Sequence, residues 1–279
     1  MSGRACLLPL SSYCWSRLCS YRRWVPTNSP MIVKDADFVF SPPPGLSWAR
    51  RVLIKPCAGY PLPYPATTSP KLLHNIITGI REISNADILI ADGTASGESI
   101  YPTYKALGYE FRHVLMLDVR DSIFIEVENP LTEFYAVESF WVPNVVLRSD
   151  FLITVTPFKV CGNSASFSVA NLLGLLPVSK YQRGDSGGWG ALYELGIEKV
   201  LADLYFTLPF DLGIIEARQK LFCTGDDDPT QGKTEDYGRM LIGEPQEIDS
   251  EASQVAGVAP EHLSLISEGR AQLEDQMGA

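Results

Sequence analysis

The sequence predicts an α/β protein with a mostly parallel, open sheet covered by helices. Two observations favour this fold class. Short apolar runs rich in β-branched residues recur along the chain, and helical patterns or glycine loops separate them. Five of these runs end in a polar or charged residue, namely Lys55, Asp92, Asp118, Thr156 with Lys159, and Glu216. Because ligands of open α/β sheets bind beyond the carboxyl ends of the strands, the sequence predicts a site there.

The first core strand and the first helix are predicted from breaks in the chain. Three prolines and a glycine at 42–45 precede a strand at 51–55, and a proline-rich loop follows it. Ser69 then suits a helix N-cap and Pro70 suits the first helical turn. The residues that recur on one face of this helix are Leu72, Leu73, Ile76, Ile77 and Ile80.

The strand at 87–91 leads into a glycine-containing loop at 92–99 and then into a helix that stops at Gly108. Free backbone N–H groups at the start of a helix bind anions. We therefore expect the loop to contact a phosphate or carboxylate through Gly93, Thr94, Ser96 and Gly97. The loop lacks the spacing of a Walker A or dinucleotide-binding motif. The alternative is a turn in which the glycines serve only the backbone conformation.

The segment between about 119 and 150 has a different pattern. Residues 123–127 and 136–141 alternate between apolar and polar side chains, and Asn129-Pro130 separates them. This pattern predicts exposed antiparallel strands, or a lid, inserted into the main sheet.

The parallel pattern resumes at 150–159, where Lys159 follows a strand end and Asn171 lies on a helix expected to pack back over the sheet. The remaining predicted elements are a flexible link at 182–190, a helix at 191–205, strands at 211–216 and 239–242, a helix at 248–255 and another from Pro260. A polar loop at 225–232 has clustered carboxylates, which are either solvated or able to hold a hard cation.

The predicted organisation is a single α/β domain at 31–270, with a short tail at 271–279. Residues 1–30 form an atypical extension that has four arginines and no acidic residue. Two interpretations are open: a transit peptide, or an upstream start codon with Met31 as the real beginning. No apolar run approaches the ~18 residues that a membrane span requires.

The formal charge of −10 lies in the C-terminal part, because residues 226–279 hold thirteen acidic and three basic residues. This distribution argues against a nucleic-acid partner. An acidic surface of this kind is either simply solvated or a docking face for a basic partner.

Six cysteines occur, and no pair has the short spacing of a zinc knuckle or a ferredoxin loop. None of His74, His113 and His262 lies at ligand spacing from another. The sequence thus predicts no preformed histidine-rich metal site and no iron–sulfur cluster. A divalent cation held by Asp92, Asp118 or Glu216 stays open. This cysteine distribution predicts a reducing, cytoplasmic setting.

Short segments in order across roughly residues 50–270 resemble the domain-of-unknown-function 362 family. The matching segments are Val52-Leu53-Ile54-Lys55-Pro56, Thr68-Ser69-Pro70, Ala91-Asp92-Gly93, Ala106-Leu107-Gly108-Tyr109, Asp150-Phe151-Leu152-Ile153, Pro157-Phe158-Lys159, Asn171-Leu172-Leu173-Gly174, Ile214-Ile215-Glu216-Ala217, Gly243-Glu244-Pro245, Ile248-Asp249 and Gly257-Val258-Ala259-Pro260.

The chain departs from the family pattern at functionally important positions. The family commonly has threonine and histidine where Val160 and Cys161 stand, lysine where Ala170 stands, and aspartate where Glu216 stands. The resemblance therefore implies an altered or absent activity relative to better-matching members. Many members also carry iron–sulfur modules, for which this chain lacks the cysteine spacing. A more distant likeness is to the nickel-pincer lactate racemase family, whose cofactor-holding histidines are not visible here.

Two hypotheses follow. In the first, the chain is an enzyme for a small anionic metabolite: Lys55, Lys159 and Asn171 bind the ligand, and Lys159, Asp92, Asp118 or Glu216 carries the chemistry. Its structural alternative pairs the two lysines with Asp92 and Asp118. In the second, the chain is non-catalytic and works with a separate iron–sulfur protein.

Overall fold

The computed structural model describes residues 31–34, 38–161, 164–165, 167–184, 188–223 and 229–278. The predictions about the N-terminal extension at 1–30 and about residues 225–228 of the polar loop lie outside this range.

A central sheet organises the molecule, in the strand order β1-β10-β9-β7-β2-β3-β4, with β8 beside β7. Its strands are β1 (Met31–Lys34), β2 (Arg51–Pro56), β3 (Asp87–Asp92), β4 (Val114–Asp118), β7 (Phe151–Cys161), β8 (Ser164–Ala165), β9 (Leu212–Cys223) and β10 (Lys233–Gly243). Strands β9, β7, β2, β3 and β4 run parallel to one another, whereas β10, β1 and β8 pair antiparallel. The predicted α/β fold with a mostly parallel open sheet is confirmed.

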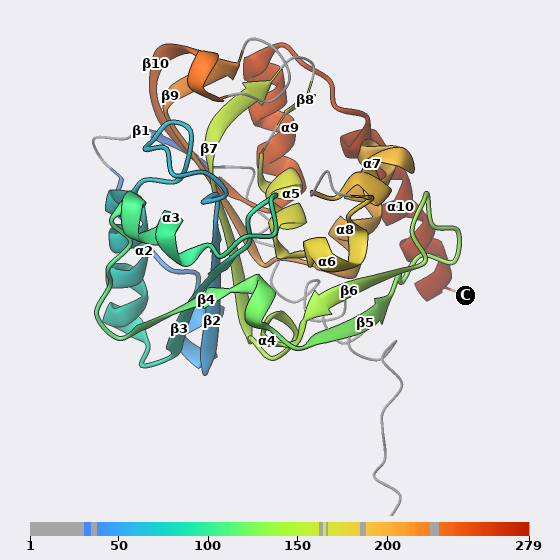
Figure 1. Cartoon of the computed structure of the whole chain (residues 1–279), viewed down its shortest axis with the longest axis horizontal. Coiled ribbons are helices and arrows are strands. Elements are labelled where there is room, and N and C mark those ends of the chain that lie inside the picture. Colours follow the sequence, from blue (N-terminus) through green and yellow to red (C-terminus); the bar gives the residue numbers. More distant parts are fainter. Residues whose placement is uncertain are drawn as a thin grey trace, which may run out of the picture.

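Helices α2 (Pro70–Ile83) and α3 (Tyr101–Leu107) cover one face of the sheet (Figure 1). Ser69 caps α2 by accepting a hydrogen bond from the Leu72 N–H, and Gly108 ends α3 with a φ of 72°. The apolar stripe of α2 packs on alternate strand residues such as Val52 and Ile54. The core on this face therefore follows the period of two that a strand imposes.

The opposite face carries α5 (Ser168–Asn171), η4 (Leu172–Leu175), α8 (Ile197–Thr207) and α9 (Pro245–Ala256), with α10 (Glu261–Gly278) packed outside α8 (Figure 1). Leu53, which lies between Val52 and Ile54 in β2, points to this side. Short elements complete the described chain: η2 (Pro44–Trp48), η3 (Val119–Asp121), α4 (Asn144–Leu147), α6 (Val178–Tyr181), α7 (Gly190–Glu194) and η5 (Pro229–Gln231).

The predicted inserted segment is a separate antiparallel pair, β5 (Phe124–Glu128) and β6 (Ser139–Pro143). Val127, Phe140 and Val142 bury it in the same core cluster as α8 and η4. The inserted antiparallel segment is therefore confirmed, but the expected exposure is wrong, because one face of the pair packs into the core.

Two elements differ from the sequence expectation. The run at 114–117 was expected to be buried on both faces, but β4 is the last strand of the sheet and Leu115 is 57% exposed. The helix expected at 191–205 is divided into α7 and α8 at Gly196, which has a φ of 91°. No helix in the described ranges is both long and apolar enough to cross a membrane.

Candidate functional site

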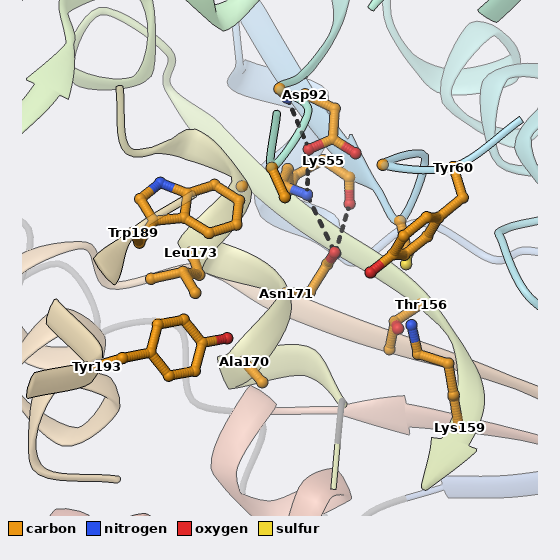
Figure 2. Close-up of a pocket in the computed structure, with 15 residues that line it drawn as sticks. Lys55, Tyr60, Asp92, Thr156, Lys159, Ala170, Asn171, Leu173, Trp189 and Tyr193 are labelled. Atoms are coloured by element: carbon orange, nitrogen blue, oxygen red, sulfur yellow. Dashed lines mark hydrogen bonds and ion pairs between the residues drawn. The ribbon is translucent and has the colours of Figure 1, made fainter. Parts of the chain in front are cut away.

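The carboxyl ends of β2 and β3 bring Lys55 and Asp92 together. Lys55 Nζ lies 2.6 Å from Asp92 Oδ1, and both side chains are almost fully buried (Figure 2). The same ammonium donates to the main-chain carbonyl of Pro56 at 2.8 Å and to Asn171 Oδ1 at 3.0 Å. An ammonium has three donors, so these acceptors satisfy Lys55 within the protein.

Both carboxylate oxygens of Asp92 also have hydrogen-bond partners within the protein. Its Oδ1 also accepts a hydrogen bond from the Gly93 N–H at 2.9 Å, and its Oδ2 accepts one from the Ala58 N–H at 2.8 Å. Burial raises the pKa of Asp92, while the Lys55 ammonium and these two N–H groups oppose the rise. The Lys55–Asp92 pairing is the one that the structural alternative predicted.

Asn171 joins the helical layer to the strand ends. Its Nδ2 donates to Thr154 Oγ1 at 3.0 Å and to the Lys55 carbonyl at 3.2 Å, which fixes the amide that accepts from Lys55. Asn171 is the last residue of α5, as its predicted position on a helix over the sheet requires.

Asp249 in α9 holds the start of α5 in place. Its two carboxylate oxygens accept hydrogen bonds from the Ser168 N–H at 2.9 Å and the Val169 N–H at 2.8 Å. Burial raises the pKa of Asp249 to about 7, and the Val169 N–H, His262 and the Ser168 N–H oppose this rise. Asp249 thereby positions the short helix that carries Asn171.

Lys159 has different surroundings from Lys55. It lies near the end of β7, just after the pairing of β7 with β9 shifts register between Pro157 and Phe158, and such irregularities re-aim side chains next to sites. The residue is only 7% exposed, and its Nζ lies 5.4 Å from the centre of the Tyr60 ring. Within the described ranges Lys159 has neither a hydrogen bond nor an ion pair. It does not pair with Asp118, contrary to the structural alternative.

A cavity of about 130 Å³ lies between these groups. Its lining includes Lys55, Asp92, Gly93, Lys159 and Asn171 from the predicted site. Figure 2 shows Tyr60 and Lys159 along one side, and Trp189, Leu173 and Tyr193 along the other. The lining also contains Cys57, Gly59, Ala95, Thr156, Ala170 and Gly174.

The rest of the glycine loop lines a second cavity, of about 160 Å³, which shares Gly93 with the first. Thr94, Ser96, Gly97 and Asp118 border this second cavity. Asp118 accepts hydrogen bonds from the Ile100 N–H at 3.0 Å and the Arg120 N–H at 2.9 Å. The structure thus separates these four predicted residues from Lys159.

Glu216 lies outside both linings. Its Oε2 accepts from the Ser69 N–H at 2.9 Å, and its Oε1 accepts from Ser69 Oγ at 2.6 Å and from Arg218 Nε at 3.0 Å. Burial raises the pKa of Glu216, while Ser69 and Arg218 oppose the rise. Glu216 therefore ties the start of α2 to β9.

Several lining residues were not singled out from the sequence. Tyr60 lies in the proline-rich loop, and Trp189 and Tyr193 lie next to or in α7, where no motif marks them. Gly174 belongs to the segment Asn171-Leu172-Leu173-Gly174, and only its close approach to Asp92 and Lys55 in space explains the absence of a side chain. The sequence marks Gly174 only as part of a segment that resembles the family pattern.

The structure also joins Cys161 and Cys223, which are 62 residues apart, in a disulfide across β7 and β9. Only the strand pairing brings them together, so cysteine spacing could not reveal it. The reducing, cytoplasmic setting stays a prediction. No group of three or more His, Cys, Asp or Glu side chains arranged to hold a metal ion occurs among the described residues.

Comparisons with family models and with solved structures both find similar proteins. A family model described as "Domain of unknown function (DUF362)" matches residues 52–252. The structure of the lactate racemase apoprotein from Thermoanaerobacterium thermosaccharolyticum is similar with a TM-score of 0.49 and 13% sequence identity, over 84% of this chain and 54% of that one. The chain thus spans about half the length of that protein. Among curated proteins no match is found.

Proposed function

The chain belongs to the DUF362 family, and from that premise we propose that it binds a small anionic metabolite, a carboxylate or a phosphate, at the carboxyl ends of its sheet strands. The binding site is the cavity bordered by Lys55, Asp92, Lys159 and Asn171.

The observation that carries this proposal is the contrast between the two buried lysines. Lys55 has a carboxylate, a carbonyl and an amide oxygen around it, whereas Lys159 reaches the same cavity with only an aromatic ring beside it among the described residues. A buried cation is costly unless a counter-charge compensates it. An anion in the cavity would supply both the charge and the hydrogen-bond acceptors that Lys159 lacks.

The surrounding groups support binding more directly than proton transfer. The carboxylates already have partners within the protein. Asp92 pairs with Lys55 and accepts from two N–H groups, Asp118 accepts from two N–H groups, and Glu216 accepts from Ser69 and Arg218. We assign Lys159 the direct contact with the anion. Lys55, Asp92 and Asn171 form the fixed polar end of the cavity.

The proposal is tested by thermal unfolding of the full chain with acetate, lactate or inorganic phosphate, each with and without Mg²⁺. At least one anion is expected to raise the melting temperature of the wild type and not that of Lys159→Met. Lys105→Met, which removes an exposed lysine of α3, is the matched control and should respond like the wild type. If no anion stabilises the wild type, the proposal fails and the role of accessory to a separate redox protein becomes the better one.

A further inference from the structure

We infer that the anion of this site is an aromatic monocarboxylate. This inference rests on the proposed function. It specifies that the ligand has an aromatic ring and a single negative charge. Three features of the cavity support it: its aromatic walls, its net charge and its size.

The walls on either side of the cavity are aromatic. The Tyr60 side chain lies on the same side as Lys159, and Trp189 and Tyr193 lie opposite it with Leu173 (Figure 2). The Trp189 Nε1 donates to the Leu176 carbonyl at 2.9 Å, and Leu176 is not part of the lining. With its polar atom already bonded, Trp189 offers the cavity an apolar ring surface. Aromatic rings pack favourably against a flat ring in offset or edge-to-face geometry.

The lining carries one uncompensated positive charge. Lys55 and Asp92 neutralise each other at 2.6 Å, and Lys159 is the remaining charged side chain among the described lining residues. A single carboxylate matches this charge. A phosphate dianion would bring a second negative charge that no described lining residue balances, and burying unbalanced charge is unfavourable.

The cavity is also of the right size for one ring. Its volume is about 130 Å³, and an engineered apolar cavity of about 150 Å³ is known to hold benzene. Tyr193 is 52% exposed, which places it at the rim of the cavity. A ring between the aromatic walls leaves its carboxylate free to reach Lys159.

The test is calorimetric titration of the full chain with benzoate, cyclohexanecarboxylate, acetate, inorganic phosphate and benzyl alcohol. Benzoate is expected to bind about tenfold or more tightly than acetate or phosphate, since it adds a buried ring to the same charge. It should also bind more tightly than cyclohexanecarboxylate, which has the same charge without a flat ring. Benzyl alcohol, which has the ring without the charge, should bind more weakly than benzoate by a similar factor.

Variants of the chain test separately how much the ring and the charge of the ligand contribute to its affinity. Lys159→Met should weaken benzoate and acetate alike, whereas Trp189→Leu should remove the preference for benzoate over acetate. Since Trp189→Leu changes a packed residue, Tyr193→Ser at the rim provides a second variant with the same expected direction. Folding of each variant is checked by circular dichroism.

The outcomes distinguish the two proposals. If acetate or phosphate binds as tightly as benzoate and depends on Lys159, the aromatic monocarboxylate is wrong while the anion site stands. Benzoate binding that survives Lys159→Met also contradicts the inference, because the carboxylate would then have another partner. If none of the anions binds the wild type, the proposed function itself fails.

Discussion

Gly174 lies directly against Asp92: a Cβ atom at position 174 would be 2.5 Å from Asp92 Oδ1 and 2.9 Å from Lys55 Nζ. Real Cβ atoms do not approach other atoms so closely. The backbone of η4 therefore reaches the Lys55–Asp92 pair only because residue 174 has no side chain.

We predict that Gly174→Ala lowers the free energy of unfolding by about 1–3 kcal/mol, because the added methyl group pushes the buried pair apart. Urea unfolding measures the loss. Gly190→Ala is the matched control, since a Cβ there would meet its nearest neighbour at 3.5 Å, an ordinary contact. Equal stability of the two alanine variants would contradict the prediction.

Lys159→Met is expected to leave the fold intact and to abolish anion binding. Loss of a charged hydrogen-bond partner costs ~1.5–3 kcal/mol, which is roughly one to two decades in affinity. The removed ammonium leaves no described acceptor unpaired, so stability should change little. Urea unfolding and calorimetric titration are measured on the same preparation. If the variant unfolds while its folded fraction still binds the anion, Lys159 is a structural residue.

Lys55→Met, in contrast to Lys159→Met, should destabilise the fold. It leaves Asp92 and Asn171 without their buried cation, and breaking a buried pair from one side costs about 3–5 kcal/mol. Adding Asp92→Asn to Lys55→Met removes the unpaired charge and is expected to restore part of the loss. The wild type and the two variants are compared by chemical denaturation, and a double variant no more stable than Lys55→Met would show that charge is not the cause.

Asp249 makes the free energy of unfolding depend on pH, and the direction of this dependence can be predicted. Its pKa is raised by burial from an ordinary value of 3.8 to about 7 in the folded chain. Between these values the folded state holds a proton that the unfolded state has lost, so this contribution to stability is present at low pH and is lost as the pH rises through 7.

The measurement is the difference in unfolding free energy between the wild type and Asp249→Asn, which cannot ionise. Between pH 5 and 7 the wild type should lose up to about 1.4 kcal/mol per pH unit relative to the variant. A difference that stays constant over this range would mean that Asp249 is ionised throughout.

The strand ends could be predicted because apolar runs and the polar residues after them are local features of the sequence. The direction of each side chain depends on the strand period and on neighbouring elements. Glu216 shares the face of Ile214, which points to α2, whereas Lys55 shares the face of Leu53, which points to η4. Both follow a strand end, yet they lie on opposite faces of the sheet.

Other parts of the site depend on contacts distant in sequence. The pattern at 114–117 could not show that β4 is an edge strand, because edge position depends on which strands pair. Tyr60 and Trp189 approach the same cavity from segments separated by more than half of the domain. No periodicity or short motif encodes such a meeting. Asn171 was predicted because the small-residue stretch before it and the helix that follows a strand are both local signals.

The two sides of the cavity come from different kinds of structure. The charged side is built into β2, β3 and β7 at the centre of the sheet, whereas Trp189 and Tyr193 belong to a peripheral segment between Gly188 and Gly196, both of which have positive φ. Sequence change in that segment would alter which molecular shape is admitted without disturbing the ion pair or the sheet. In the proposed site, ligand shape is thus set by the segment at 188–196 and ligand charge by the strands of the sheet.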